Sequence, residues 1–429
     1  MITIYSKKKS PRLAYVCKFI FHEFFGLNYQ LIHQYTDTHA PLINYSETKQ
    51  PNGIFILPSG LLDEEIPETE QLTPKWINKI PYLFHDSKSE CGFDIFSAVF
   101  FCLSRYEEYN SYVPDSHGRF PATESIAYKH NFLHLPVVDL WLLELKDLLI
   151  KKFSDLNFGD RKFKFHSTID IDNAYKFQGK NIIRLAGAGI KEILAGKSNR
   201  LPRRINFLFK KNNDPFDAYD FQSETSKKFK IPLTYFVLFT FPGPFDNSLP
   251  ATSKQLKQLV RKLKSNAQIG IHPSYRSSER IYRMEEEIQM LSNEIQAQIK
   301  SSRQHFLRFK LPITFLQLLA SGIETDYSIG YSTHNGFRAG TCTPFLFYNL
   351  AEENTTELRL VPFQIMDSVF YDQQEISAQE AMKEIEGIVA SVKSVKGQLF
   401  SVWHDRSFDE LDYPGWRETY LKLHQLCSE

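Results

Sequence analysis

The chain has 429 residues, with 51 Lys or Arg against 50 Asp or Glu, so its formal net charge at pH 7 is +1. Hydrophobic residues make up 42% of the chain and aromatic residues 14%, which excludes a mainly disordered protein. The balanced charge also excludes a protein that is basic overall, so nucleic acid is not the expected partner. A chain of this length is expected to form two or three domains.

The cysteines and the apolar segments indicate the compartment. Five cysteines are scattered without a Cys-x-x-Cys pair: Cys17, Cys91, Cys102, Cys342 and Cys427. This odd set predicts reduced thiols rather than a disulfide framework or a cysteine-ligated zinc site. No apolar run has the length of a transmembrane helix, and Lys18 and Glu23 interrupt the only stretch that resembles a signal peptide. We therefore expect a soluble, cytoplasmic protein.

Residues 1–155 are predicted to form a mixed α/β domain that is smaller than the rest of the chain. Apolar periodicity and turn residues predict three helices and one short strand: 12–25, 93–109 and 136–153 for the helices, and 53–58 for the strand. The turn-rich residues 154–162 are the predicted linker to a second domain, residues 163–429.

Strands alternate with helices in the second domain. The predicted strands cover 163–172, 233–240, 268–275 and 398–403, and the predicted helices cover 252–265, 279–300 and 377–396. The last of these helices begins with a capping box formed by Ser377 and Glu380 and ends at Gly397. This alternation predicts an α/β fold with a parallel sheet or barrel.

One insertion in the second domain is strongly basic. Residues 176–211 contain ten Lys or Arg and one Glu, so the insertion carries +9 while the rest of the chain carries −8. Two interpretations stay open. The insertion is either a solvated helical surface or a docking surface for an anionic glycan, a membrane surface or nucleic acid. Binding to nucleic acid would weaken steeply with salt.

The strongest chemical signal is the stretch 166–173, His-Ser-Thr-Ile-Asp-Ile-Asp-Asn. On a strand, four of its side chains share one face: His166, Thr168, Asp170 and Asp172. Two carboxylates at the end of a buried strand suit one metal ligand and one general base, because an unpaired buried charge is costly. The alternative is a pair of aspartates that caps the following loop. His166 is interpreted as a core residue or as a support for a ligand.

Two histidines supply candidate metal ligands. His272 ends the predicted strand 268–275, and His305 lies in the motif RQHFLR, expected on the next strand. Neutral imidazole is a common ligand of zinc, although a lone histidine is more often structural. Together with Asp172, the two histidines would form a carboxylate and two imidazoles, which leaves positions for water and substrate.

Three further polar residues suit catalysis. Arg338 lies in the turn-rich loop FRAGT, where a guanidinium can orient a carboxylate or phosphate, and loop packing is the alternative. His404 ends the last predicted strand, and Asp367 follows the apolar run LRLVPFQI. An imidazole at such a strand end can protonate a leaving group, and a nearby carboxylate can orient it.

The order of these motifs, TIDID, GIHPSY, FRAGT, IMD and VWH, resembles that of the polysaccharide deacetylases of carbohydrate esterase family 4, over residues 163–410. A divergent bacterial branch of that family also carries a motif like RQHFLR, and residues 1–155 resemble an uncharacterised domain that often precedes it. The resemblance implies a distorted (β/α) barrel, often seven-stranded, with a divalent metal that is usually zinc. It also implies hydrolysis of an N- or O-acetyl group on a carbohydrate.

The same resemblance assigns the catalytic roles. Asp170 takes the place of the general base, and Arg338 takes the place of the arginine that holds this base. His404 takes the place of the acid that protonates the leaving amine or alcohol, supported by the carboxylate of Asp367. A backbone N–H near 340–341 is expected to stabilise the oxyanion together with the metal.

The metal ligands depart from the family pattern. Asp172 and His272 match two ligands, but Ile171 separates two aspartates that are adjacent in ordinary members. The second metal histidine, four residues after the first, is replaced by Arg276, whose guanidinium cannot bind a metal. We hypothesise that His305 takes its place. This requires His305 to lie close to the other two ligands, because Zn–N bonds are only ~2.0–2.1 Å long.

A glycan-binding or assembly protein that retains this fold without activity is the alternative function, and Arg276 favours it. The presence of five catalytic residues together argues against it, since binding alone would not need them: Asp170, Asp172, Arg338, Asp367 and His404. A cytoplasmic enzyme would suit a small acetylated sugar or a biosynthetic intermediate better than a finished cell-wall polymer.

Overall fold

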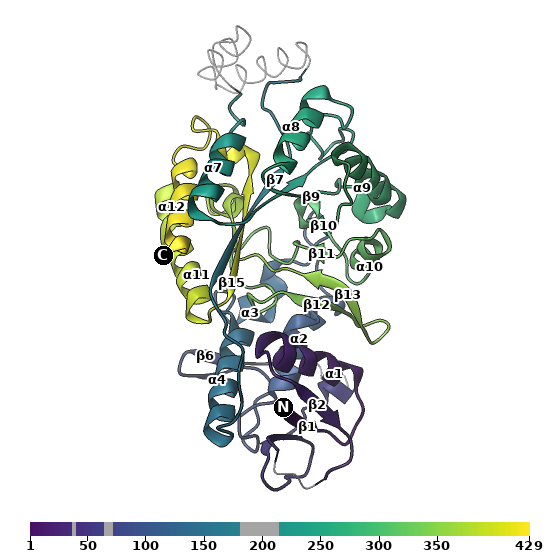
Figure 1. Ribbon diagram of the computed structural model, residues 1–429, viewed down its shortest axis with the longest axis vertical. Coiled ribbons are helices and arrows are strands. Elements are labelled where there is room, and N and C mark those ends of the chain that lie inside the picture. Colours follow the sequence, from purple (N-terminus) through teal and green to yellow (C-terminus); the bar gives the residue numbers. More distant parts are fainter. Residues whose placement is uncertain (37–39, 64–71, 181–213) are drawn as a thin grey trace.

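The computed structural model describes residues 1–36, 40–63, 72–180 and 214–429 (Figure 1). The predicted basic insertion, 176–211, lies outside the described residues apart from its first five positions, so both interpretations of it stay predictions. None of the described helices combines the length and apolar character needed to cross a membrane.

The N-terminal segment, which we define as residues 1–155, contains a four-stranded parallel sheet in the order β2–β1–β3–β4. Its strands are β1 (Ile2–Tyr5), β2 (Tyr29–Ile32), β3 (Leu42–Tyr45) and β4 (Ile54–Ile56), and a hairpin joins β5 (Lys75–Ile77) to β6 (Ile80–Tyr82). Its helices are α1 (Pro11–Cys17), α2 (Ile95–Leu103), α3 (Ile126–Lys129) and α4 (Val137–Lys152). The pattern predicts α1, α2, α4 and β4. It misses β1, β2, β3, β5 and β6, which have three or four residues each and, unlike β4, are not followed by a Pro-Ser-Gly turn signal.

The described residues after 163 are built on a nine-stranded sheet in the order β12–β13–β11–β10–β9–β8–β7–β15–β14 (Figure 1). All neighbouring strands are parallel except β12 and β13. The strands are β7 (Lys164–Ile171), β8 (Leu233–Val237), β9 (Gln268–Ile271), β10 (Ser301–Ser302), β11 (Thr325–Asp326), β12 (Phe345–Asn349), β13 (Asn354–Leu360), β14 (Ile365–Met366) and β15 (Gln398–His404). The expected α/β alternation is confirmed.

One segment connects the two ends of the row of parallel strands, which runs from β13 to β14 in the sheet order. β13 pairs with β11, and β14 pairs with β15 at the opposite end of the sheet, although only four residues separate β13 from β14. Within this connection, the Phe363 N–H donates to the Ile329 carbonyl (3.0 Å), and the Gln364 N–H donates to the Phe400 carbonyl (3.1 Å). Residues 354–366 therefore bridge the first and last parallel strands.

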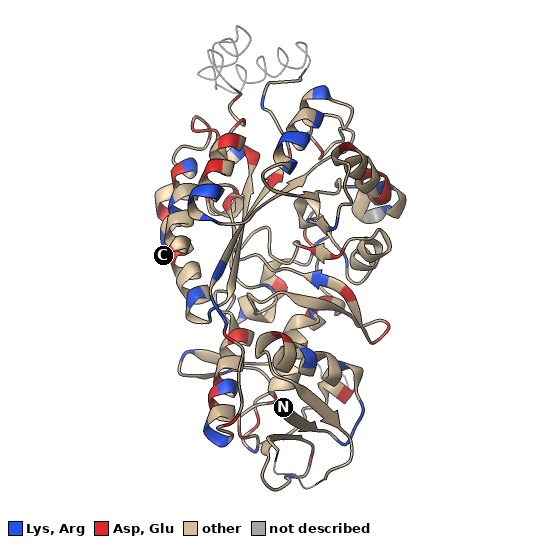
Figure 2. Cartoon of the chain, viewed as in Figure 1, with Lys and Arg blue, Asp and Glu red and all other residues tan. Residues whose placement is uncertain are grey.

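Six helices of this part lie outside the sheet (Figure 1). They are α7 (Tyr219–Phe229), α8 (Lys254–Lys264), α9 (Ile281–Ile295), α10 (Ile313–Ala320), α11 (Ala378–Ser394) and α12 (Trp416–Ser428). These helices contain many charged residues of both signs (Figure 2). The predicted capping box is confirmed, because the Ser377 hydroxyl accepts from the Glu380 N–H and Glu380 accepts from the Ser377 N–H.

β7 and β15 are adjacent, buried strands near the β14 end of the sheet order, and they position the chemistry. Their register aligns Asp170 with His404 at the carboxyl ends of both strands. Residues Phe165 and Ser167–Ile171 of β7 are buried, as is β15 from Leu399 onward. Parallel strands end at the same edge of a sheet, and ligand sites of α/β folds lie at the carboxyl edge.

The N-terminal segment packs against the sheet part rather than standing apart from it. One continuous hydrophobic cluster includes side chains from both parts. The Arg12 guanidinium forms a bidentate pair with Glu353, with N–O distances of 2.9 and 2.6 Å, and the Tyr15 hydroxyl donates to the Leu346 carbonyl (2.8 Å). The two parts therefore share a core.

Candidate metal centre and catalytic site

Four parallel strands deliver polar side chains to one edge of the sheet. Asp172 follows the last residue of β7, His272 follows the last residue of β9, and His404 ends β15. The segment that follows β10, residues 303–305, lies at the same edge. His305 lies in a 3₁₀ turn (His305–Leu307) and not on a strand, which corrects the expectation for it. The turn brings the imidazole back over the sheet edge.

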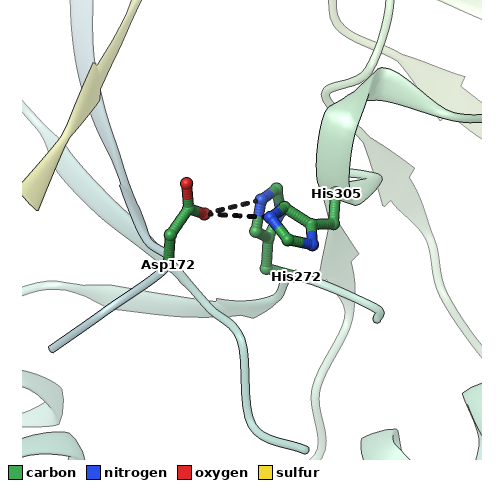
Figure 3. A group of neighbouring side chains, drawn as sticks. All are labelled: Asp172, His272 and His305. Carbon is green, nitrogen blue, oxygen red and sulfur yellow. Dashed lines mark ion pairs between the residues drawn. The ribbon is translucent and has the colours of Figure 1, made fainter. Parts of the chain in front are cut away.

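The structure brings Asp172, His272 and His305 together (Figure 3). The Oδ1 atom of Asp172 lies 3.3 Å from His272 Nε2 and 3.6 Å from His305 Nε2. One ligand atom from each residue lies within 4.8 Å of the other two. His305 therefore lies close to the other two candidate ligands, as the His305 hypothesis requires. Arg276, at the usual position of the second histidine, is exposed instead.

Both imidazoles are oriented through their other ring nitrogen. His272 Nδ1 lies 2.5 Å from the Arg303 carbonyl, and His305 Nδ1 lies 3.0 Å from Asp246 Oδ1. A carbonyl or carboxylate oxygen can only accept, so both Nδ1 atoms carry the hydrogen and both Nε2 atoms face Asp172. Metal-binding histidines are commonly oriented in this way.

The donor set fits a divalent cation. Asp172 Oδ1 is buried and has no hydrogen-bond partner among the described residues, although it faces two ring nitrogens. Burial lowers the pKa of His272, but the carboxylates of Asp170 and Asp172 outweigh this and raise it above its ordinary value. The position therefore attracts positive charge. One carboxylate oxygen and two imidazole nitrogens are ligands of zinc and similar ions.

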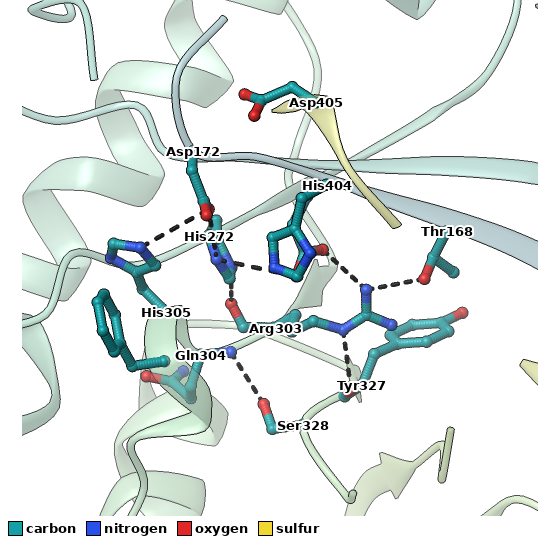
Figure 4. Close-up of polar contacts among 12 residues, drawn as sticks. Thr168, Asp172, His272, Arg303, Gln304, His305, Tyr327, Ser328, His404 and Asp405 are labelled. Carbon is teal, nitrogen blue, oxygen red and sulfur yellow. Dashed lines mark hydrogen bonds and ion pairs between the residues drawn. The ribbon is translucent and has the colours of Figure 1, made fainter. Parts of the chain in front are cut away.

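Arg303, and not Arg338, holds the candidate base, which corrects the expectation for Arg338. The Arg303 guanidinium donates through Nη1 to Asp170 Oδ1 (2.8 Å) and to the Thr168 hydroxyl (2.7 Å), as Figure 4 shows for Thr168. Its Nε donates to the Tyr327 carbonyl (3.0 Å), and its Cζ atom lies 4.5 Å from the Phe236 ring centre. These contacts fix Asp170 in a buried position.

Arg338 serves a different part of the molecule. Its guanidinium forms a bidentate pair with Glu108 of the N-terminal segment, at 2.9 and 2.6 Å, and donates to the Gly330 carbonyl (2.8 Å). At Gly340 the backbone N–H is not the donor expected for the site, because it donates to the Phe337 carbonyl (2.9 Å). The FRAGT loop is therefore part of the contact between the two parts of the chain.

His404 and Asp367 form the expected pair. His404 Nδ1 lies 2.6 Å from Asp367 Oδ1, and Asp367 Oδ2 accepts from the His404 N–H (2.7 Å) and the Ser407 hydroxyl. Burial lowers the pKa of His404, but Asp367 raises it by more, and the result is a pKa of about 9. The imidazole is thus protonated at neutral pH, as a general acid must be.

Sequence reasoning missed three residues of the site. Arg303 stands two residues before His305, so its proximity to a proposed ligand was an available signal. Asp246 lies in the loop after β8, and no sequence motif marks it. Asp405 follows His404 and accepts from the Asn173 N–H (2.6 Å), and burial, reinforced by the charge of Asp172, raises its pKa to about 7.

His166 lies away from these groups, on the opposite end of β7. Its ring stacks on Phe400 of the neighbouring strand, with ring centres 4.7 Å apart and planes within 13°. Burial lowers its pKa to about 4, so the ring is neutral at physiological pH. The contacts are those of a core residue.

Comparisons with known proteins give one family match and several weak structural similarities. Residues 2–154 match a family of unknown function, DUF7033. No match was found among curated proteins.

Similar solved structures include a protein described as a polysaccharide deacetylase from Mycobacterium smegmatis (12% identity, 63% of this chain and 86% of that chain, TM-score 0.41). Others are a pseudoenzyme of carbohydrate esterase family 4 from Bacillus anthracis (9%, 61% of each chain, 0.32) and a family 4 carbohydrate esterase from Streptomyces lividans (8%, 62% and 91%, 0.30). These TM-scores are low, so the site is interpreted from its own geometry.

Proposed function

We propose that this protein is a metal-dependent hydrolase that removes an N- or O-acetyl group from a carbohydrate. One observation carries the proposal: the Nε2 atoms of His272 and His305 converge on a buried Asp172 oxygen that has no hydrogen-bond partner among the described residues. We infer that zinc or a similar divalent ion is held by these three side chains. We also infer that the connection through residues 354–366 closes the sheet into the expected barrel.

The residues around this position suit acyl-group hydrolysis. A bound divalent cation would polarise the acetyl carbonyl and lower the pKa of a water molecule. Asp170, held by Arg303 and 3.9 Å from His272 Nε2, would take the proton from that water. His404, protonated and oriented by Asp367, would donate a proton to the leaving amine or alcohol. Base and acid therefore flank the three ligands.

The carbohydrate substrate rests on the motif order shared with the polysaccharide deacetylases. In that order the strand-end residues Asp170, Asp172, His272, Asp367 and His404 retain their places, whereas the arginine that holds the base comes from a different segment. A free acetylated sugar or a biosynthetic intermediate is the proposed substrate class. An anionic partner of residues 176–211 remains a separate prediction.

The proposal is tested by metal content and acetate release. Purified protein is expected to bind one zinc ion, and His272→Ala and His305→Ala are each expected to lower zinc affinity by about 100-fold or more. The exposed His22→Ala is the matched control and should bind zinc as wild type does. Acetate release is assayed with N-acetylglucosamine oligomers and O-acetylated xylo-oligosaccharides.

Two results would overturn the proposal. Wild-type protein that stays free of zinc after reconstitution would contradict the metal centre. Zinc-loaded protein that binds these oligosaccharides but releases no acetate would support the silent glycan-binding alternative instead.

A further inference from the structure

The turn that carries His305 has an unusual backbone. Phe306 (φ 59°, ψ 12°) and Leu307 (φ 52°) both adopt the left-handed conformation, although neither is glycine. Two consecutive bulky residues in this region are costly, and such a turn persists only where its surroundings hold it. Something other than local preference must therefore keep His305 in place.

Two of the contacts that hold the turn come from the N-terminal segment. Arg119 Nη1 donates to the carbonyl of Phe306 at 2.6 Å, and the Arg119 side chain is only 13% exposed. On the other side, Arg308 Nε donates to the carbonyl of His117 (3.0 Å). Both contacts span almost two hundred positions of sequence, and they lie on either side of Leu307 in the turn.

The loop that supplies these contacts is itself fixed. Asp115 Oδ1 accepts from the N–H groups of His117 (2.9 Å) and Arg119 (3.0 Å), and Asp115 Oδ2 accepts from Arg119 Nε (2.7 Å). The Arg119 guanidinium is thus held in one orientation, with its Nη1 aimed at the turn. A preorganised donor of this kind restricts the turn more than a freely rotating side chain would.

Aromatic contacts continue the same link to the metal ligand. The His117 ring lies 5.0 Å from the Phe306 ring, which in turn lies 4.6 Å from the His305 ring. His117 Nδ1 is also 3.0 Å from the Tyr275 hydroxyl, three residues beyond His272. Loop 115–119 therefore contacts the segments that carry both histidine ligands.

We propose that loop 115–119 of the N-terminal segment is a clamp that positions His305 for metal binding, with Arg119 as its principal positioning residue. The proposal rests on the proposed metal centre and gives the N-terminal segment a role in it. Asp246 orients the imidazole through Nδ1, whereas Arg119 holds the backbone from which that imidazole projects. Loss of either support lets Nε2 move away from Asp172.

The test compares two arginines that both join the N-terminal segment to the sheet part. Arg119→Ala removes the clamp, and Arg12→Ala removes the equally buried pair with Glu353 as the matched control. We expect Arg119→Ala to weaken zinc affinity by about 10-fold or more and to alter the visible spectrum of the cobalt-substituted protein. Arg12→Ala should keep both properties, whatever it does to thermal stability.

A second measurement tests the clamp without metal. Amide hydrogen exchange across residues 305–308 of the metal-free full-length protein is expected to accelerate about 10-fold in Arg119→Ala and not in Arg12→Ala. Equal zinc affinity and equal exchange in wild type and Arg119→Ala would overturn the clamp. Wild-type protein that binds no zinc would overturn the metal centre instead, and exchange alone would then decide whether the clamp exists.

Discussion

Asp170 and Asp172 are two residues apart on one strand end, yet the structure gives them different surroundings. Asp172 faces two imidazoles, whereas Asp170 accepts from Arg303, which also donates to the Thr168 hydroxyl. Both carboxylates meet the segment 303–305, but Asp170 pairs with the Arg303 guanidinium, whereas Asp172 faces the imidazole of His305 and, from the end of β9, that of His272. Within this one motif, Asp172 is thus the candidate metal ligand and Asp170 the candidate base. Substitution of each residue can test this assignment.

Asp170→Asn is expected to separate catalysis from metal binding. The amide cannot accept a proton, so turnover of the acetylated oligosaccharides should fall by about 100-fold or more, while zinc affinity stays within a few-fold of wild type. Asp246→Asn is the matched comparison, because it weakens the acceptor of His305 Nδ1 and should reduce zinc affinity. Full turnover by Asp170→Asn would remove Asp170 from the role of base.

His404 is expected to titrate near pH 9 in the metal-free protein. Burial opposes its protonation, but Asp367 more than compensates and raises its pKa to about 9. A raised imidazole pKa stabilises the folded state fully below the unfolded value of about 6.5, and this stabilisation is lost as the pH rises through 9. Asp367→Asn should lower the pKa measured by NMR and flatten the fall in unfolding free energy between pH 6.5 and 9. An unchanged titration would contradict the pairing.

At the scale of elements, the packing of β9 against β8 requires a glycine at position 270. Gly270 faces Phe236 of β8, and a Cβ atom at Gly270 would lie 2.6 Å from that ring and 2.8 Å from the Ser301 hydroxyl. The same Phe236 ring lies against the Arg303 guanidinium. The small residue in β9 therefore makes room for the ring that supports the arginine of the base.

Gly270→Ala is expected to destabilise the protein and to reduce turnover. Overpacking of a core contact typically costs about 1–3 kcal/mol, and displacement of Phe236 should disturb Arg303 and hence Asp170. Gly387→Ala is the control, since no atom lies within 4 Å of its added Cβ on helix α11, and it should stabilise by about 0.5–1 kcal/mol. Urea unfolding and acetate release measure both effects. If Gly270→Ala had the stability and turnover of the wild type, β9 would accommodate the added methyl group and the prediction would be wrong.

At the scale of the whole molecule, a buried ion pair joins the two parts of the chain. The side chains of Glu108 and Arg338 are each only 4% exposed, and Arg105 donates to the same carboxylate (2.8 Å). Burial raises the pKa of Glu108, but Arg338 and Arg105 outweigh this and lower it below its ordinary value. Two guanidinium groups thus depend on one carboxylate.

Glu108→Ala is expected to destabilise the entire chain by about 3–5 kcal/mol, because it removes the carboxylate that pairs with buried Arg338 and one of the two that pair with buried Arg105. Asp372→Ala, which breaks the half-exposed pair with Arg406, is the control and should cost about 1 kcal/mol or less. We expect a single unfolding transition in urea by fluorescence and circular dichroism, since both parts share one core. Two separate transitions would contradict this coupling.

The periodicity and turn signals of the sequence predict the elements with a long amphipathic or apolar pattern. They locate α2, α4, α8, α9, α11, β7, β8 and β15, with the largest errors at the ends of α2 and α9, which the structure ends at Leu103 and Ile295 instead of 109 and 300, and they place His272 and His404 at strand ends. They do not predict β10, β11 or β14. These strands have two residues each, and their neighbours in the sheet define them rather than their own sequence.

The sequence by itself determined which strands end in carboxylates and imidazoles, because side-chain alternation and strand boundaries are local properties. It also supplied His305 as a candidate ligand. Only the tertiary structure decided which arginine holds Asp170. Arg303 and Arg338 are chemically identical, and the choice depends on which loop reaches the sheet edge and which is drawn to Glu108, 230 positions away. Contacts over such distances arise from packing, which no local pattern records.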